Sequence, residues 1–184
     1  MNETSPPNLV LAGFMGTGKS TLGPLVARRL GRPFVDTDGV IEAEMGLSVS
    51  GIFARYGEGV FREREREVCV RLAGMGGQVI AVGGGALMDP ANRVALASTG
   101  VIVLLTCERH ALVSRLRKSA ARGERPLLGR NLEGTIDRLL GEREPAYASI
   151  PLRVDTTDLT LEQAAERAIE LYGLAWANRQ AGVL

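Results

Sequence analysis

The chain has 184 residues, of which 45% are hydrophobic and 23% charged, and its formal net charge is +1. This length suffices for one domain with a hydrophobic core, and the balanced charge gives no overall attraction to nucleic acid or to anionic membranes. No apolar run approaches the roughly 20 residues of a membrane span, and residues 1–7 lack the apolar region of a signal peptide. Cys69 and Cys107 form no C-x-x-C pair, so we expect buried, reduced cysteines in a cytoplasmic protein.

Strand-like and helix-like segments alternate along the chain. We expect strands at residues 8–12, 33–35, 78–82, 101–105 and 152–154. We expect helices at residues 19–30, 39–45, 50–73 (with a break near Gly57), 90–98, 108–118, 131–143 and 161–172. Such alternation predicts an α/β fold with a parallel sheet. We interpret residues 1–7 as a flexible leader, 8–172 as a single domain and 173–184 as a C-terminal tail.

Residues 13–20 match the phosphate-binding pattern G-x-x-x-x-G-K-[ST] without a mismatch, between a predicted strand and a predicted helix. Glycines let the backbone curl so that successive N–H groups point at phosphate oxygens, and the helix N-terminus adds partial positive charge. Lys19 can reach the β- and γ-phosphates, and the Ser20 hydroxyl can ligate Mg²⁺. The motif therefore predicts a site for the phosphates of a nucleotide at Gly16, Thr17, Gly18, Lys19, Ser20 and Thr21, which the resemblance described below assigns to ATP.

Asp36 and Asp38 bracket Thr37 where a short predicted strand ends. In extended backbone, residues two apart point the same way, so one carboxylate can face a metal through water while the other meets a substrate hydroxyl. Phosphoryl transfer needs charge compensation and a group that orients or deprotonates the attacking oxygen. The alternative interpretation is that one of these aspartates caps the helix expected at residues 39–45.

Three further segments carry candidate binding groups. Gly83–Gly85 lets backbone approach a ligand, and we favour this over a tight turn because three glycines exceed what a turn needs. Arg62 follows an aromatic residue and suits a substrate carboxylate, whereas most of the charged run 61–67 is typical of a solvated helix face. The segment 115–130 is rich in Arg and Lys and favours a lid that closes over the nucleotide. A nucleic-acid surface is less favoured there, because aromatic residues for base stacking are absent.

Missing motifs narrow the class of phosphate-loop protein. The chain has no guanine-specific N-K-x-D motif, and no predicted strand is an aliphatic run ending in Asp, as in motor ATPases. Among phosphate-loop proteins, these absences leave a small-molecule kinase as the favoured class.

In this order, the segments G-F-M-G-T-G-K-S-T-L-G, F-V-D-T-D, G-E-x-x-F-R, G-G-G and R-P-L-L, with Arg143 four residues before Tyr147, resemble the shikimate kinase family. The resemblance covers about residues 8–172. It implies a P-loop kinase fold similar to that of nucleoside monophosphate kinases, with a five-stranded parallel sheet flanked by helices and a mobile basic lid at about 115–130. It also implies ATP-dependent phosphorylation of the 3-hydroxyl of shikimate, in aromatic amino acid biosynthesis, by a cytoplasmic monomer that requires Mg²⁺.

The resemblance also implies roles for individual residues. It assigns catalysis to Asp38, as the base, with Lys19 and with Arg125, a lid arginine that also reaches the phosphates of ATP. It assigns shikimate binding to Asp38, Arg62, Gly84 and Arg143. It assigns Mg²⁺ to Ser20, with Asp36 acting through water, and it places Phe53 and Phe61 near the substrate ring.

Alternatives stay open at this stage. Quinate or gluconate could be the acceptor, and a catalytically silent nucleotide-binding module is a further possibility, although intact Lys19, Ser20, Asp38 and Arg125 argue against it. The residue that meets adenine is open among Arg115, Arg117 and Lys118.

Overall fold

One parallel sheet organises the computed structural model, which describes residues 6–121 and 131–182. Its strands in these residues are β1 (Asn8–Gly13), β2 (Phe34–Asp36), β3 (Val79–Ala81), β4 (Gly100–Thr106) and β5 (Arg153–Asp155). They pair in the order β2-β3-β1-β4-β5, and every pairing is parallel. The predicted five-stranded α/β architecture is confirmed.

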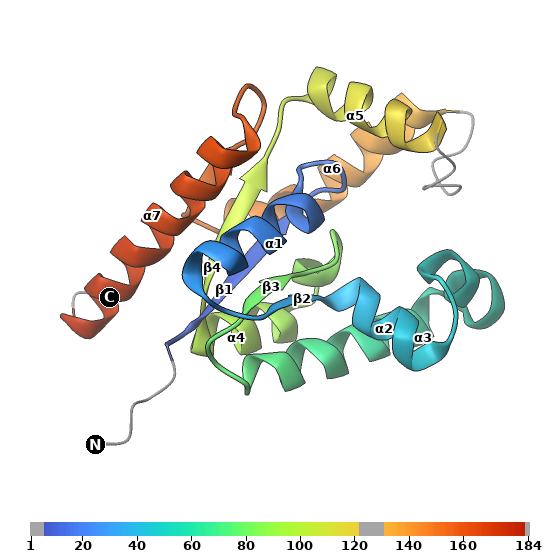
Figure 1. Cartoon of the computed structure of the whole chain (residues 1–184). Coiled ribbons are helices and arrows are strands. Elements are labelled where there is room, and N and C mark those ends of the chain that lie inside the picture. The colour runs from blue at the N-terminus through green and yellow to red at the C-terminus, as the bar shows by residue number, and fades with distance from the viewer. Residues whose placement is uncertain (1–5, 122–130, 183–184) are drawn as a thin grey trace.

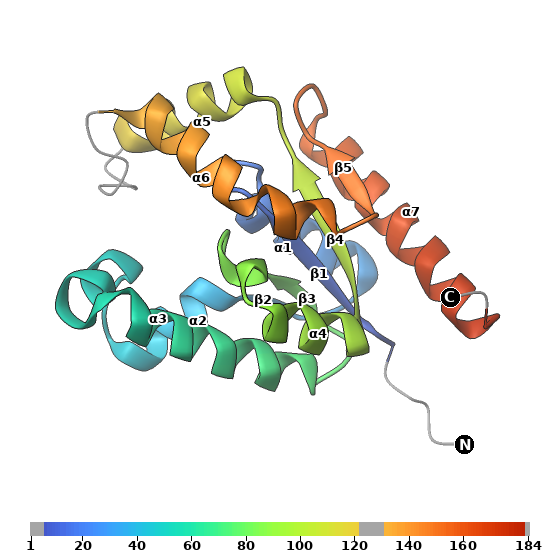
Figure 2. The same ribbon diagram turned by 180° about the vertical axis from the view of Figure 1, so that it is seen from behind.

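Helices cover both faces of this sheet (Figures 1 and 2). They are α1 (Lys19–Leu30), α2 (Thr37–Met45), α3 (Val49–Ala73), α4 (Pro90–Thr99), α5 (Arg109–Ala121), α6 (Leu132–Ala148) and α7 (Leu161–Gln180), with a short 3₁₀ helix, η1 (Ala86–Met88). The predicted break in α3 is present, because Gly57 adopts a φ of 82° there. Helix α6 continues five residues beyond the predicted end at residue 143.

The core divides into two layers according to the alternation of side chains along the strands. Leu9 and Leu11 of β1 pack with α1 and α7 on one face, while Val10 and Ala12 pack with the helices of the opposite face. Successive residues of a strand point to opposite faces, and a parallel sheet covered on both sides needs apolar residues at every position. All six residues of β1 are accordingly buried.

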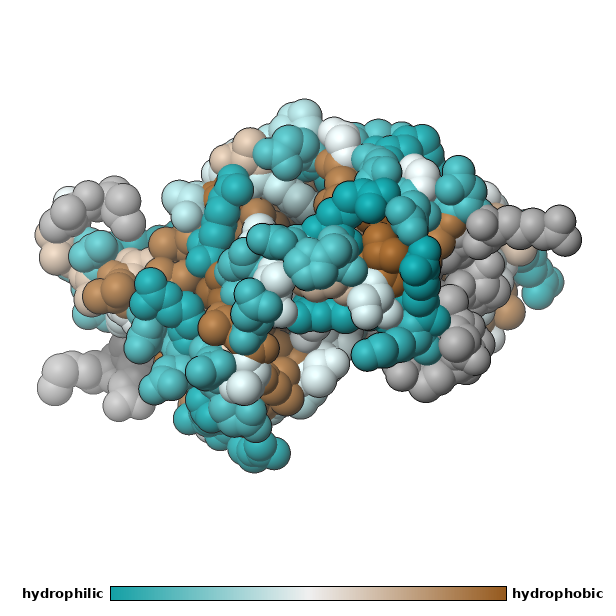
Figure 3. All heavy atoms as spheres, turned by 90° about the horizontal axis from the view of Figure 1, so that it is seen from above, coloured by the Kyte–Doolittle hydropathy of each residue, from teal (hydrophilic) through white to brown (hydrophobic). Residues whose placement is uncertain are grey.

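The strand order brings the functional loops together at one end of the sheet. Strands β1, β2 and β3 are neighbours, and their carboxyl ends lead into the phosphate loop, Asp36 and the glycine run at residues 83–85. Parallel α/β sheets bind ligands at this end. Viewed from above, the surface is mostly hydrophilic, with hydrophobic side chains showing between the hydrophilic ones (Figure 3).

The C-terminal residues differ from the prediction. We expected a tail from residue 173, but α7 continues to Gln180. Tyr172 and Ala175 are buried and extend the apolar stripe of Ala165 and Ala168 at helical spacing. The Tyr172 hydroxyl also donates a hydrogen bond to the Pro7 carbonyl (2.9 Å), which fixes the helix beside the start of β1.

Two smaller expectations concern cysteines and membranes. Cys69 is buried and free, whereas Cys107 is free but only partly buried, so the expectation of burial is correct for Cys69 alone. Among the described residues, the helices are too short or too polar to cross a membrane.

Candidate active site

The phosphate loop joins β1 to α1 in a conformation that depends on glycine. Gly16 and Gly18 adopt φ angles of 85° and 103°, which side chains disfavour. Gly18 is also the N-cap of α1, and no side chain caps the helix there. The first N–H groups of a helix lack partners within the helix, so this end of α1 is suited to an anion.

Lys19 and Ser20 are the first two residues of α1, directly after the glycines of the phosphate loop. The Lys19 Nζ donates to the carbonyls of Gly13 (2.7 Å) and Phe14 (3.1 Å), which folds the ammonium group over the loop. The Ser20 hydroxyl donates to Asp36 Oδ2 (2.7 Å). A hydroxyl and a carboxylate oxygen together at the phosphate loop are the hard ligands that Mg²⁺ accepts in combination with phosphate oxygens.

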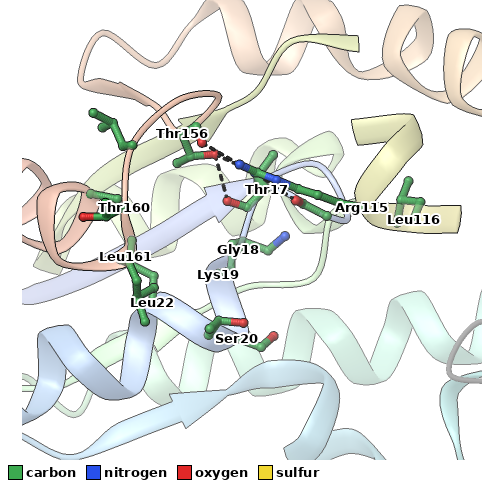
Figure 4. A pocket seen from close by; sticks show the side chains of 14 residues that line it. Thr17, Gly18, Lys19, Ser20, Leu22, Arg115, Leu116, Thr156, Thr160 and Leu161 are labelled. Carbon is green, nitrogen blue, oxygen red and sulfur yellow. Dashed lines mark hydrogen bonds between the residues drawn. The ribbon is translucent and has the colours of Figure 1, made fainter. Parts of the chain in front are cut away.

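A cavity of about 410 Å³ lies beside the phosphate loop (Figure 4). Residues 16–22 form one wall, and Arg115, Leu116, Thr156 and the start of α7 form the other. Arg115 donates to the Thr156 carbonyl (2.6 Å) and hydroxyl (3.1 Å), and it also reaches the Gly16 carbonyl (3.4 Å). Of the three basic residues that the sequence left open, Arg115 is therefore the one that lines this cavity.

A second cavity, of about 880 Å³, collects the predicted acceptor-binding residues. Asp38, Arg62, Gly84 and Arg143 all line it, although they come from four separate segments of the chain. Phe53 and Phe61 line it too, with ring centroids 5.0 Å apart. Arg125, the predicted lid arginine, lies outside the described residues.

Asp36 has the expected extended backbone, but Asp38 lies in the first turn of α2, so the expectation is wrong for Asp38. Strand β2 ends at Asp36, which caps α2 by accepting a hydrogen bond from the Asp38 N–H (3.1 Å). Asp38 is therefore not the N-cap, and its side chain is left to the cavity. Burial, together with the negative charges of Asp36 and Glu65, raises the pKa of Asp38 to about 6.

Glu65 is a site residue that sequence reasoning missed. It belongs to a run of alternating charges that we interpreted as a solvated helix face, yet it is 1% exposed. Its Oε2 accepts from the Arg62 Nη1 (2.7 Å), while Glu58 binds the other side of the same guanidinium (2.9 Å). The signal that could have found it is helical spacing, because Glu65 lies four residues after Phe61 and three before Val68, on the buried face of α3.

Each residue of the glycine run lies against a charged side chain. A Cβ on Gly83 would stand 2.7 Å from both Asp38 Oδ1 and Glu65 Oε1. On Gly84 it would stand 2.8 Å from Arg143 Nη1, and on Gly85 it would stand 2.7 Å from Arg62 Nη1. Real Cβ contacts are essentially never this short. The run is thus more than a tight turn, because it makes room for the charged groups of the cavity.

Arg143 reaches the glycine run from α6. It is 8% exposed, and its guanidinium lies over the Phe14 ring, 4.9 Å from the centroid. Among the described residues, Arg143 Nη1, Asp38 Oδ1 and Glu65 Oε1 are buried without a hydrogen-bond partner. Gln78 Oε1 and Asn92 Oδ1 share this state but do not line the cavity. Buried polar atoms normally have partners, and a polar ligand in the cavity could supply those of Asp38, Glu65 and Arg143.

The fold and the two cavities define a P-loop kinase for a small acidic acceptor, and comparison with known proteins agrees. The family model for shikimate kinase matches residues 15–172. The shikimate kinase of Geobacter sulfurreducens is 47% identical over 156 residues, 84% of each chain. The chain therefore belongs to the shikimate kinase family.

Solved structures give the same result. The shikimate kinase of Acinetobacter baumannii, solved in complex with shikimate, superposes with a TM-score of 0.82 and 34% identity over 94% of each chain. A gluconokinase from Sinorhizobium meliloti has a TM-score of 0.64 but 17% identity, which shows the shared fold alone.

The environment of Asp38 predicts that Asp38→Asn stabilises the ligand-free protein. The folded-state pKa, about 6, lies above the ordinary value of 3.8 for an aspartate, so ionisation of this carboxylate destabilises the fold as pH rises between these values. At pH 7 the variant should unfold with a free energy higher by up to about 3 kcal/mol. Urea denaturation at pH 7 and at pH 4 measures this difference, which should largely vanish at pH 4. An equal difference at both pH values would contradict the assignment.

Proposed function

We propose that the chain catalyses the ATP-dependent phosphorylation of the 3-hydroxyl of shikimate, giving shikimate 3-phosphate and ADP. The observation that carries the proposal is the cavity in which Arg62, Arg143 and Asp38 meet beside the phosphate loop. Membership in the shikimate kinase family and the likeness to a shikimate-bound structure support the same acceptor.

The two arginines are proposed to bind the carboxylate of the acid. A guanidinium forms paired, charge-assisted hydrogen bonds to a carboxylate. Arg62 is held by Glu58 and by buried Glu65, and Arg143 is held by its stacking on Phe14. The guanidinium groups are therefore fixed before the acid arrives, which lowers the entropy cost of binding. Gly84 contributes backbone at the same wall.

Asp38 is proposed to orient the attacking hydroxyl and to accept its proton. A general base is most effective with a pKa near the working pH, and the pKa of Asp38 is raised toward that range. Its Oδ1 has no partner among the described residues, so it can accept a hydrogen bond from a substrate hydroxyl. Asn at this position cannot take the proton, and a fall in kcat of about 100-fold or more is expected for Asp38→Asn.

The phosphate loop is proposed to hold ATP, with Lys19 placed to steady the transferring phosphoryl group and with Arg125 adding a cation. Ser20 would hold Mg²⁺ directly and Asp36 through water, since their oxygens already lie 2.7 Å apart. When bound, Mg²⁺ neutralises charge on the phosphates during transfer. Arg115, at the cavity of the phosphate loop, is proposed to contact the nucleoside part of ATP.

The direct test of the acceptor is ADP release measured separately with shikimate, quinate and gluconate. We expect turnover with shikimate, and weak or no turnover with gluconate, because gluconate is an open chain that lacks the ring facing Phe53 and Phe61. Quinate carries one hydroxyl more than shikimate and is the stringent comparison. Turnover of gluconate without turnover of shikimate would refute the proposal.

The proposed carboxylate site predicts a selective effect of Arg62→Ala. Loss of hydrogen bonds to a charged group should raise KM for shikimate by about 10- to 100-fold, while KM for ATP changes little. Arg64→Ala is the matched control, because Arg64 lies on the same helix and pairs with Glu67 at the surface. Steady-state kinetics with each substrate varied in turn makes the comparison, and an equal rise in both KM values would indicate a structural role for Arg62 instead.

A further inference from the structure

Tyr147 joins two proposed acceptor-binding groups without lining the cavity itself. It follows Arg143 by four residues on α6, is 7% exposed, and is not among the residues that line the acceptor cavity. Its hydroxyl donates a hydrogen bond to the carbonyl of Gly84 at 2.7 Å. One helix therefore carries both the arginine that faces Gly84 and the tyrosine that holds the Gly84 peptide.

The hydrogen bonds of the glycine run show why this contact matters. The Gly83 carbonyl accepts from the Ala86 N–H (3.0 Å) and the Gly85 carbonyl accepts from the Met88 N–H (2.9 Å), so both bonds close turns within the same segment. The Gly84 carbonyl instead accepts from a side chain of another helix. Glycine restrains its own backbone poorly, and the Tyr147 hydroxyl supplies an external restraint at the middle of the run.

The backbone of Tyr147 is itself held by hydrogen bonds. Its carbonyl accepts hydrogen bonds from Arg153 Nη2 (3.0 Å) and from the Ile150 N–H (3.0 Å), where α6 turns into β5. The backbone that carries the ring is therefore held independently of the glycine run. Burial raises the pKa of Tyr147, while the charge of Arg143 and a side-chain hydrogen bond with Arg143 oppose this rise, so the hydroxyl remains a proton donor at neutral pH.

Gly84 and Arg143 have little free space between them. A Cβ on Gly84 would stand 2.8 Å from Arg143 Nη1, so the peptide and the guanidinium are already close together. A shift of the Gly84 peptide would change the distance between two groups that must meet the same ligand. Misplacement by about 1 Å can cost a site much of its effectiveness.

We infer that Tyr147 is a positioning residue for the acidic substrate: its hydroxyl sets the Gly84 peptide at a fixed distance from Arg143. The inference rests on the proposed roles of Gly84 and Arg143 in binding shikimate. Tyr147 acts through these two groups and does not touch the substrate. Its removal should weaken binding of the acid equally in the ground state and in the transition state, which raises KM and leaves kcat unchanged.

The test is Tyr147→Phe, with Tyr172→Phe as the matched control. Tyr172 is also a buried tyrosine whose hydroxyl donates to a backbone carbonyl, that of Pro7, but it lies on α7 and lines neither cavity. We expect Tyr147→Phe to raise KM for shikimate about fivefold to tenfold, the loss of about one hydrogen bond. KM for ATP and kcat should stay within about twofold of the wild type. Tyr172→Phe should lower Tm about as much as Tyr147→Phe does, but it should change neither KM.

Two results would overturn the inference: an unchanged KM for shikimate in Tyr147→Phe, or an equal rise in both KM values. Arg143→Lys, measured alongside, separates this failure from failure of the proposed site. If Arg143→Lys raises KM for shikimate and Tyr147→Phe does not, only the role of Tyr147 is wrong. If Arg143→Lys leaves KM for shikimate unchanged, the proposed carboxylate site fails and the inference fails with it.

Discussion

Four charged side chains crowd against three consecutive residues that have no side chains of their own. Asp38 and Glu65 approach Gly83, Arg143 approaches Gly84 and Arg62 approaches Gly85, each within 2.8 Å of where a Cβ would stand. The charges come from α2, α3 and α6, so the glycine run is the common surface on which these helices place them. Because β3 lies beside β1 in the sheet, the same run lies next to the phosphate loop. The phosphate loop and the acceptor cavity thus meet at the glycine run, where backbone lies close to charged side chains.

The charged groups of this arrangement lower the stability of the ligand-free fold. Two carboxylates approach one glycine, and the pKa values of both are raised, chiefly by burial. Buried oxygens of Asp38 and Glu65 and a buried nitrogen of Arg143 lack partners within the described residues. Unpaired buried polar groups each destabilise a protein by about 1–3 kcal/mol. In the proposed function, a substrate that carries a carboxylate and hydroxyls would supply the missing partners, and its binding energy would offset this cost.

Much of this could be predicted from the sequence, because the relevant signals are local. Hydrophobic periodicity and strand-to-helix alternation indicated the sheet and its helices, and the phosphate loop is a continuous motif. The rest depends on tertiary contacts. Helical spacing puts Glu65 on the same face as Phe61 and Val68, but whether a charged residue there is buried depends on what packs against it. Gly173 resembles a stop signal, although α7 continues through it to Gln180. The expectation of extended backbone fails at Asp38 because α2 begins at Thr37, directly after the strand end.

We propose that the glycine run keeps the charged groups of the acceptor site in place, and the kinetics of Gly83→Ala are the sharpest check of this role. The added methyl group would meet Asp38 and Glu65 oxygens at 2.7 Å. Gly59→Ala is the control, since a Cβ there meets nothing within 4 Å. With shikimate and ATP saturating, Gly83→Ala is predicted to lose about 10- to 100-fold in kcat, since a 1 Å displacement of a reacting group costs about this much, while Gly59→Ala keeps the wild-type value. A Gly83→Ala enzyme with wild-type kcat and KM would contradict the account.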